Sequence, residues 1–322
     1  MVGICGARRM RRELLGGEAL MRIWGILLTA VLAANAASAE ELTGTLQKIK
    51  ETNRIAIGFQ ESSVPFSYLD GNQKPVGYAL DICARIAEAV KTELRLPNLT
   101  IETVPVTSSN RIPLMTNGTI DLLCASTTNN AERQKLVAFA NTHFLSATRF
   151  AAKKSLSIDT IEDLKGKTAV AIAGSTNIAQ LNKVNVERKL GINIVPAKDQ
   201  AEAFLMLETD RAQAYVLDDV QLAVAIARSK DPAAYAISKD EFSKPEPFGI
   251  MLRKDDAPFK AIADRVTAQL YQSPDIEAIY RKWFESPVPP IGINFNYPMP
   301  SALRAAFKKP SSSPDPDAYV LN

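Results

Sequence analysis

Short apolar segments alternate with amphipathic segments along the chain after its N-terminal region. Three apolar runs, at 54–59, 99–106 and 118–125, have the length and the flanking turn residues of buried strands. Apolar residues recur about every 3.6 positions over 76–90, which indicates an amphipathic helix, and a shorter helix is indicated at 111–116. This alternation of strands and helices predicts an α/β fold with a doubly wound, mostly parallel sheet.

The same order is repeated further along the chain. Strands are predicted at 168–173, 192–195 and 211–217, and helices at 176–190 and 200–208. Each half therefore contains one strand–helix–strand–helix–strand unit, and we predict two lobes of the same class.

The C-terminal part adds a strand and helices before it becomes polar. A strand is predicted at 246–252, followed by one long helical stretch through Trp283 that ends at a proline-rich segment. A helix-capable segment at 302–308 then leads into a Ser/Pro-rich tail. We expect the tail after Lys309 to be mobile, because it has few apolar residues to bury.

From Met21 the sequence has the features of a secretory signal peptide. Arg22 is followed by a short apolar run and by the small-residue triplet Ala37–Ser38–Ala39. We predict cleavage after Ala39, which makes residues 1–39 the signal peptide and places the mature protein in the periplasm. An uncleaved membrane anchor is the alternative, and translation that starts at Met21 is a hypothesis for the first twenty residues.

Charge and cysteine content narrow the classes of function. The predicted signal peptide contains five Lys or Arg and two Asp or Glu, so the remaining chain carries 33 bases and 33 acids. This balance gives no support for binding to nucleic acid or to an anionic membrane. Cys83 and Cys124 remain, either as buried thiols or as a disulfide. The sequence has no Cys/His metal spacing, and we predict no metal or cofactor; His143, the only histidine, is expected to be a satisfied structural residue.

The strand at 118–125 ends in hydroxyl residues that lead into a helix start. Free backbone N–H groups and the helix dipole favour an anion there, and Arg133, one turn along, can hold it through two parallel hydrogen bonds. This pattern predicts a socket for a carboxylate or a phosphate, with an ordinary capped turn as the alternative. The turn at Gly174–Thr176 lies at the equivalent place in the second half, which strengthens the prediction of a site.

Several motifs resemble those of the polar amino-acid-binding proteins of bacterial ABC importers. They are Pro65–Phe66–Ser67–Tyr68, Gly77–Tyr78–Ala79–Leu80–Asp81, Gly118–Thr119–Ile120–Asp121 and Asp163–Leu164–Lys165–Gly166–Lys167 with Gly174–Ser175–Thr176. Within that family, the segments 107–114, 126–135 and 251–256 are similar to the glutamate/aspartate-binding branch. The resemblance covers nearly the whole chain after the signal peptide.

The resemblance implies a two-lobed periplasmic-binding-protein fold of type II, with two crossover strands between the lobes. Lobe 1 is then formed by residues 40–146 and 248–300. Lobe 2 is formed by residues 147–247, with the crossover strands at its ends, and residues 301–322 form a C-terminal tail that is partly mobile.

The resemblance also implies roles for individual residues. Arg133, Thr128 and Ser126 would hold the α-carboxylate of an amino acid from lobe 1, and Thr176 would close on it from lobe 2. Asp218 would bind the α-ammonium group, since a buried zwitterion needs donors at one end and a carboxylate at the other. The alternative for Asp218 is a helix cap or a solvated loop residue.

The side-chain end of the predicted site departs from the branch. The resemblance leads us to expect an arginine at the position of Gln60 and a histidine at the position of Gln200, and both are glutamine here. Ser108 and Arg111 remain, although a surface salt bridge is the alternative for Arg111. Arg111 keeps one cation at this end, so we predict binding of glutamate and aspartate. Glutamine side chains both donate and accept, so we predict glutamine and asparagine as further ligands.

We therefore predict a monomeric extracytoplasmic binding subunit that delivers an amino acid to permease subunits in the inner membrane. A periplasmic enzyme of the dehydratase type on the same fold is one alternative, and a sensory module is another. An enzyme would need an acid–base group beside the ligand, for which the cleft candidates are Glu61, Asp218 and Asp219.

Overall fold

The computed structural model describes Met1, residues 42–290 and residues 292–320. The predicted signal peptide lies outside the described residues, apart from Met1. Residues Thr43–Asn322 form one compact unit, to which all elements described below belong. None of the helices among the described residues combines the length and the apolarity that crossing a membrane requires.

A first five-stranded sheet has the strand order β5-β1-β6-β15-β7. Its strands are β5 (Thr100–Pro105), β1 (Arg54–Phe59), β6 (Leu122–Leu123), β15 (Met251–Arg253) and β7 (Val137–Phe139). β1 runs parallel to both β5 and β6, whereas β15 is antiparallel to β6 and β7. The fold is thus α/β as predicted, with one reversed strand in this sheet.

A second five-stranded sheet has the order β11-β10-β12-β9-β13. Its strands are β11 (Asn193–Ala197), β10 (Thr168–Ile172), β12 (Ala214–Asp218), β9 (Thr148–Lys153) and β13 (Tyr235–Ile237). β10 is parallel to β11 and β12, and β9 is the reversed strand. The two sheets therefore share one architecture, as the repeated sequence pattern predicts.

Two strands carry the chain between the sheets. β8 (Phe144–Ser146) leads from β7 to β9, and β14 (Glu246–Phe248) leads back from β13 to β15, and the two pair antiparallel. The single strand predicted at 246–252 is wrong in this respect, because Gly249 and Ile250 separate β14 from β15. Gly249 packs against the Phe139 side chain at the point where the chain changes sheets.

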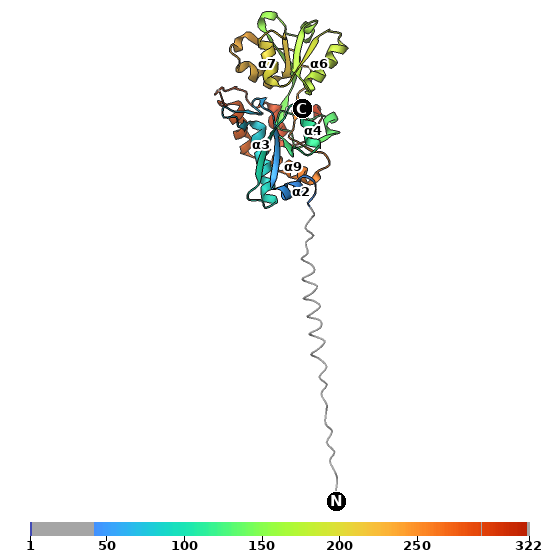
Figure 1. The fold of residues 1–322 in the computed structure, drawn as a ribbon, viewed down its shortest axis with the longest axis vertical. Helices are drawn as coiled ribbons and strands as arrows, with labels where there is room; N and C mark the ends of the chain where they lie inside the picture. The colour runs from blue at the N-terminus through green and yellow to red at the C-terminus, as the bar shows by residue number, and fades with distance from the viewer. Residues whose placement is uncertain (2–41, 291, 321–322) are drawn as a thin grey trace. The chain divides into compact units, whose positions relative to one another are not determined.

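Helices cover both sheets (Figure 1). Around the first sheet are α2 (Gly44–Thr52), α3 (Tyr78–Glu93), α4 (Arg111–Thr116), α5 (Ala131–Gln134), α9 (Ala257–Tyr271), α10 (Pro274–Phe284) and α11 (Ser301–Lys308). Around the second are α6 (Thr176–Glu187), α7 (Gln200–Glu208) and α8 (Asp219–Ala227). The remaining elements are β2 (Ser62–Ser63), β3 (Ser67–Leu69), β4 (Pro75–Val76) and the 3-10 turns η1 (Lys154–Leu156), η2 (Ile161–Leu164), η3 (Pro232–Ala234) and η4 (Pro316–Tyr319).

The long helix predicted to run through Trp283 is divided into α9 and α10. The side chain of Ser273 accepts a hydrogen bond from the backbone N–H of Asp275, and Pro274 occupies the first position of α10. Proline is favoured at that position because no intrahelical partner is available for an N–H there. The apolar periodicity continues across this cap, which is why the pattern alone suggested one helix.

The buried side chains of the second sheet follow the two-residue period of its strands. On β9, Phe150 and Ala152 belong to the core on one face, and Ala151 belongs to the core on the opposite face. Leu181 of α6 covers the first face, and Met206 of α7 covers the second. Neighbouring residues of a strand point to opposite faces, so apolar strands such as this one need helices on both sides.

An aromatic cluster fixes the crossover strands to the first half. Phe144 of β8 lies 4.9 Å from Phe66 and 5.2 Å from Phe284, measured between ring centroids. His143 is fully buried in the same cluster, and burial lowers the pKa of its imidazole to about 3. Its burial among aromatic side chains is in keeping with a structural residue, although neither ring nitrogen lies within ordinary hydrogen-bond geometry of a described residue.

Cys83 and Cys124 form a disulfide. Cys83 lies on α3, and Cys124 directly follows β6. Both residues are fully buried. The bond therefore ties the main helix of the first half to the segment that leads into Ser126.

The C-terminal tail packs against the body of the protein, which differs from our expectation for the residues after Lys309. The backbone N–H of Thr142 donates to the carbonyl of Ser311 at 2.8 Å. The side-chain amides of Asn129 and Gln134 both donate to the carbonyl of Ser312. These contacts use backbone carbonyls, and a polar sequence gives no sign of them.

Candidate functional site

A small cavity lies at the carboxyl ends of strands from both sheets. In this closed arrangement its free volume is only about 10 Å³, which is room for about one water molecule. Eight of the nine predicted site residues line it: Gln60, Ser108, Arg111, Ser126, Thr128, Thr176, Gln200 and Asp218. The structure therefore brings together residues that lie far apart along the chain.

Asp218 is the acidic group of the cavity. Its side chain is 4% exposed and accepts a hydrogen bond from Asn177 Nδ2 at 3.1 Å. Burial raises the pKa of its carboxyl to about 7, and the hydrogen bond from Asn177 opposes this rise. Asp218 occupies the cap position of α8 but makes no side-chain capping bond, so capping does not account for the direction of its carboxylate.

Arg111 is the cation that lines the cavity. It is buried, and its Nη1 donates to the hydroxyl of Thr127 at 3.2 Å, while Nε has no hydrogen-bond partner among the described residues. Burial and the nearby charge of Arg133 lower the pKa of its guanidinium, which Asp218 opposes. The alternative of a surface salt bridge is wrong, since Arg111 is buried and makes no salt bridge with a described residue. A buried cation of this kind requires an anion nearby.

Arg133 lies beside the cavity and is not among the residues that line it. Its Nη1 donates to the carbonyl of Thr128 at 2.8 Å, and its Nη2 reaches the carbonyl of Gly174 at 3.5 Å. Burial lowers the pKa of the guanidinium to about 10, against the opposing charges of Glu246 and Asp218, so Arg133 is protonated at neutral pH. Its direct contact with a ligand carboxylate stays a prediction.

The predicted helix start before Arg133 is only one turn long. Asn130 caps α5 by accepting from the backbone N–H of Arg133 at 2.9 Å. A four-residue helix contributes little dipole, so the anion-binding character of this segment rests on the hydroxyls of Ser126 and Thr128 and on the arginines. The hydroxyl of Ser126 already bonds to that of Ser63 at 2.9 Å.

The two halves of the molecule touch around the cavity. The hydroxyls of Thr128 and Thr176 lie 3.1 Å apart, and the hydroxyl of Ser109 donates to the carbonyl of Ala173 at 3.0 Å. Gly174 has φ +76° and lies so close to the other half that an added Cβ would be 2.8 Å from Cα of Ser109. Glycine alone satisfies both the backbone conformation and this close approach.

Gln60 and Gln200, which we assign to the side-chain end of the ligand, both line the cavity. Gln60 Nε2 donates to the hydroxyl of Ser108 at 3.1 Å, and its Oε1 is buried without a partner in the described part of the chain. Gln200 Oε1 accepts from the hydroxyl of Ser62 at 3.1 Å. The amides can reverse their orientation, so this end can both donate and accept.

Five further residues line the cavity: Ile172, Ser175, Asn177, Leu217 and Gln221. Gln221 Nε2 donates to the hydroxyl of Ser63 at 2.8 Å and so joins the two halves. Gln221 lies three positions after Asp218, and a helical spacing of three would have identified it as a neighbour on the same face. Asn177 follows the predicted Thr176 directly and holds the carboxylate of Asp218.

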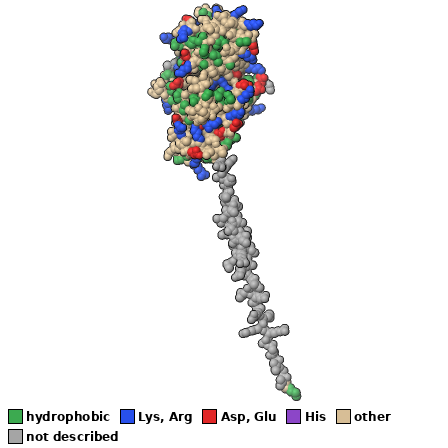
Figure 2. Space-filling view, turned by 45° about the vertical axis from the view of Figure 1, so that its right-hand side comes forward, with side chains coloured by type: hydrophobic (Ala, Val, Ile, Leu, Met, Phe, Trp, Pro, Cys, Tyr) green, Lys and Arg blue, Asp and Glu red, His purple; other side chains and the backbone are tan. Residues whose placement is uncertain are grey.

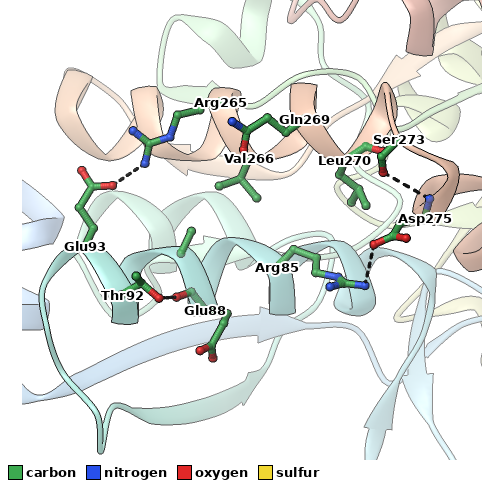
Figure 3. A pocket seen from close by; sticks show the side chains of 11 residues that line it. Arg85, Glu88, Thr92, Glu93, Arg265, Val266, Gln269, Leu270, Ser273 and Asp275 are labelled. Carbon is green, nitrogen blue, oxygen red and sulfur yellow. Dashed lines mark hydrogen bonds and ion pairs between the residues drawn. The ribbon is translucent and has the colours of Figure 1, made fainter.

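A larger groove on the first half contains none of the predicted site residues. It lies between α3 and α9, where Arg85 pairs with Asp275 at one end and Arg265 pairs with Glu93 at the other (Figure 3). Its charges are mostly matched, in contrast to the cavity around Arg111. On the face shown in Figure 2, basic and acidic side chains are interspersed, in keeping with the balanced charge after residue 39.

Comparisons with known proteins point to one family. A model of the bacterial extracellular solute-binding proteins, family 3, matches residues 55–286. The chain is 44% identical to an L-glutamate/L-aspartate-binding protein of Pseudomonas aeruginosa, over 89% of this chain and 96% of that protein. It is 43% identical to a glutamate/aspartate import solute-binding protein of Escherichia coli K12, over 90% of this chain and 95% of that protein.

A solved structure has the same fold. The crystal structure of a mutant of ArgBP from T. maritima superimposes with a TM-score of 0.67 at 27% sequence identity. The match covers 74% of this chain and 99% of that one.

Proposed function

The chain belongs to the bacterial extracellular solute-binding proteins, family 3, and we propose that it binds glutamate and aspartate as the substrate-binding subunit of an ABC importer. The names of its relatives from Pseudomonas aeruginosa and Escherichia coli support this choice of ligand. The observation that carries the proposal is the placement of the buried groups Arg111 and Asp218 on one closed cavity.

The polar groups around the cavity suit a small zwitterion, and the two halves must move apart to admit it, because the free volume between them is only about 10 Å³. The carboxylate of Asp218 is positioned for an ammonium group, which would keep it ionised against the effect of burial. Arg111 lines the cavity and supplies positive charge for a carboxylate. Arg133 lies beside the cavity, donates to the carbonyl of Thr128 and supplies a second positive charge. We assign the α-carboxylate to Arg133, Thr128, Ser126 and Thr176, and the side-chain carboxylate to Arg111 and Ser108.

We further propose that glutamine and asparagine bind to the same cavity. Gln60 and Gln200 lie at its side-chain end and supply no positive charge. The unpartnered Oε1 of Gln60 would accept from the N–H of a ligand amide, whereas a reversed Gln60 amide would donate to a ligand carboxylate. Selection between acids and amides then depends chiefly on Arg111.

Closure of two lobes would trap the ligand. We assign residues 40–146 and 248–300 to one lobe and 147–247 to the other, with β8 and β14 as the crossovers. Three hydrogen bonds between two side chains join the two parts around the cavity: Thr128 to Thr176, Ser62 to Gln200, and Ser63 to Gln221. The protein would act outside the cytoplasm as a monomer after removal of residues 1–39, and deliver its ligand to the permease.

An enzyme on the same fold is the less favoured candidate. Of the three acid–base candidates, only Asp218 lines the cavity. Glu61 is exposed and lines an outer groove, and the carboxylate of Asp219 accepts from the hydroxyl of Ser146. A sensory role is supported by no feature of the described residues.

Thermal unfolding in the presence of each of the twenty amino acids tests the proposal. A ligand that binds only the folded state raises the melting temperature by an amount that grows with its concentration. We expect the largest shifts for glutamate and aspartate, smaller shifts for glutamine and asparagine, and none for lysine and histidine. A shift for lysine or arginine but not for glutamate would overturn the assignment.

A further inference from the structure

An outer groove adjoins the cavity. Its walls come from both halves: residues 61–69 on one side, and α7, β12 and α8 on the other. Gln200, Leu217 and Gln221 line both the inner cavity and the outer groove. The two spaces therefore meet at these three side chains.

The partition between the two spaces contains two side-chain hydrogen bonds. The hydroxyl of Ser62 donates to Gln200 Oε1 at 3.1 Å, and Gln221 Nε2 donates to the hydroxyl of Ser63 at 2.8 Å. A neutral hydrogen bond contributes only about 1 kcal/mol net, and neither bond involves the backbone. Rotation of these side chains would connect the cavity with the groove at modest cost.

Buried polar atoms without partners lie on both sides of this partition. In the described part of the chain, Gln60 Oε1, Gln221 Oε1 and the hydroxyl of Tyr215 make no hydrogen bond. Their residues are 4%, 3% and 0% exposed, respectively. The two amide oxygens are acceptors, and a ligand that presents an N–H at this point would satisfy one of them.

The outer groove has the character of a site for an apolar group that ends in an anion. Val64, Phe204 and Val224 form part of its wall. Arg228 and Lys230 are exposed at its rim and form no ion pair with any described residue, although Glu61 and Glu208 also line the groove.

From these features we propose that the protein binds γ-glutamyl amides, and in particular γ-glutamyl dipeptides with an apolar second residue. This inference rests on the proposed function, since the glutamyl α-carboxylate and α-ammonium would occupy the inner cavity. The γ-amide N–H would donate to Gln60 or Gln221, and the second residue would lie in the outer groove. Its terminal carboxylate would face Arg228.

The linkage of the dipeptide is part of the proposal. In a γ-linked dipeptide the glutamyl α-carboxylate and α-ammonium are both free, as they are in glutamate. In an α-linked dipeptide that carboxylate is part of the peptide bond, so the groups around Thr128 and Thr176 lose their anion. The α-linked isomer is therefore the matched control ligand.

Calorimetric titration of the protein with γ-Glu-Leu, α-Glu-Leu, glutamate and glutamine tests this inference. We expect γ-Glu-Leu to bind within about tenfold of glutamine and α-Glu-Leu to give no saturable heat. Binding of glutamate or glutamine without binding of γ-Glu-Leu would overturn this inference and leave the proposed function intact. If none of the four bound, the proposed function itself would fail.

Variants locate the second residue of the dipeptide. Ala201 is exposed and lines the outer groove, so Ala201→Phe should weaken γ-Glu-Leu by at least about tenfold and leave glutamate within about twofold. Ala233→Phe, at an exposed position outside the groove, is the control. Arg228→Gln should weaken γ-Glu-Leu by about three- to tenfold, compared with Arg211→Gln on the surface. Equal affinities in Ala201→Phe and Ala233→Phe would show that the dipeptide does not occupy the groove, and glutamate binding verifies the fold of each variant.

Discussion

The hydroxyl of Thr128 lies 3.1 Å from the hydroxyl of Thr176, and this contact joins the two halves of the protein at the cavity. Thr128 also forms an antiparallel bridge to Phe248, the last residue of the crossover strand β14. Thr176 is the first residue of α6, beside the cap residue Ser175. The contact therefore links the segment that follows β6 in the first half to the start of α6 in the second, with the crossover adjacent.

Gly174→Ala should weaken ligand binding by preventing this close approach. The new Cβ would lie 2.8 Å from Cα of Ser109, which is backbone and cannot rotate away. Gly166→Ala is a matched control, because Gly166 also has a positive φ but no atom within 4 Å of the added Cβ. Both variants should lose about 1–2 kcal/mol of stability from the left-handed backbone, and only Gly174→Ala should lose about tenfold or more in affinity for glutamate. Equal affinities of the two variants, measured by calorimetry, would contradict a closed bound state.

The affinity for an amino acid should decrease as the pH falls through 7. Burial raises the pKa of the Asp218 carboxyl to about 7, so its ionisation destabilises the empty, closed cavity as the pH rises through that value. The ammonium of a ligand offsets this cost only when Asp218 is ionised. Below pH 7, we therefore expect binding to release a proton. The association constant should fall as the pH is lowered, by at most about tenfold for each pH unit.

Asp218→Asn is the variant that checks this pH dependence. It should weaken the binding of glutamate and remove the proton release seen in calorimetric titrations in buffers of different ionisation enthalpy. Asp219→Asn is the control, because burial also raises the pKa of Asp219 but its carboxylate does not line the cavity. Loss of the pH dependence in Asp219→Asn alone would show that the wrong carboxylate has been assigned.

Arg111→Ala should reduce the affinity for glutamate and aspartate more than that for glutamine and asparagine. Arg111 lines the cavity and has a free Nε, so the variant removes the cation assigned to the side-chain carboxylate. A charge-assisted hydrogen bond contributes about 1.5–3 kcal/mol, which corresponds to an affinity loss of roughly ten- to a hundredfold for the acids.

Arg133→Ala is the companion to Arg111→Ala, and it should abolish binding of all four amino acids. Arg133 supports the carbonyl of Thr128 and is assigned to the α-carboxylate, which acids and amides share. Equal losses for all four ligands in Arg111→Ala would mean that the two ends of the ligand have been assigned in reverse.

Truncation after Lys309 should destabilise the protein, because the tail supplies hydrogen-bond acceptors to the body. The backbone N–H of Thr142 and the side-chain amide of Asn129 would lose their acceptors, and both residues are almost fully buried. Each buried unsatisfied group costs about 1–3 kcal/mol, so we expect a loss of roughly 2–6 kcal/mol in chemical denaturation. Lys244→Ala removes only the exposed ion pair with Asp317 and should cost less than about 1 kcal/mol. An unchanged stability of the truncated protein would show that the tail contacts contribute nothing.

Local sequence patterns predicted the elements with clear boundaries. β1 at 54–59, α4 at 111–116 and α7 at 200–208 agree with the prediction to the residue. In each case a run of one periodicity is bounded by polar or turn residues, so local preference and tertiary packing indicate the same limits. The predictions failed where one pattern continues across a break, as at Gly249 between β14 and β15.

Most of the residues that line the cavity could be predicted from the sequence, and some could not. Its hydroxyl and charged residues follow strand ends, a position that marks binding sites in sheets of this class, and the family resemblance supplied their roles. Gln221 was missed although its spacing of three residues from Asp218 pointed to it, whereas its bond to Ser63, 158 residues away, could be found only from the fold. The bonds from Asn129 and Gln134 to the tail were missed because the acceptors are backbone carbonyls, which every sequence has.

Amino acids with an acidic or amide side chain are the ligands that we propose for the cavity. Calorimetric titration tests this proposal most directly, with protein that has been unfolded and refolded to remove any bound ligand, and with glutamate, aspartate, glutamine, asparagine, lysine and histidine. We predict saturable one-to-one binding of the first four, with the acids at least as tight as the amides, and no binding of lysine or histidine. Absence of heat with all four, or binding of lysine in their place, would contradict the account.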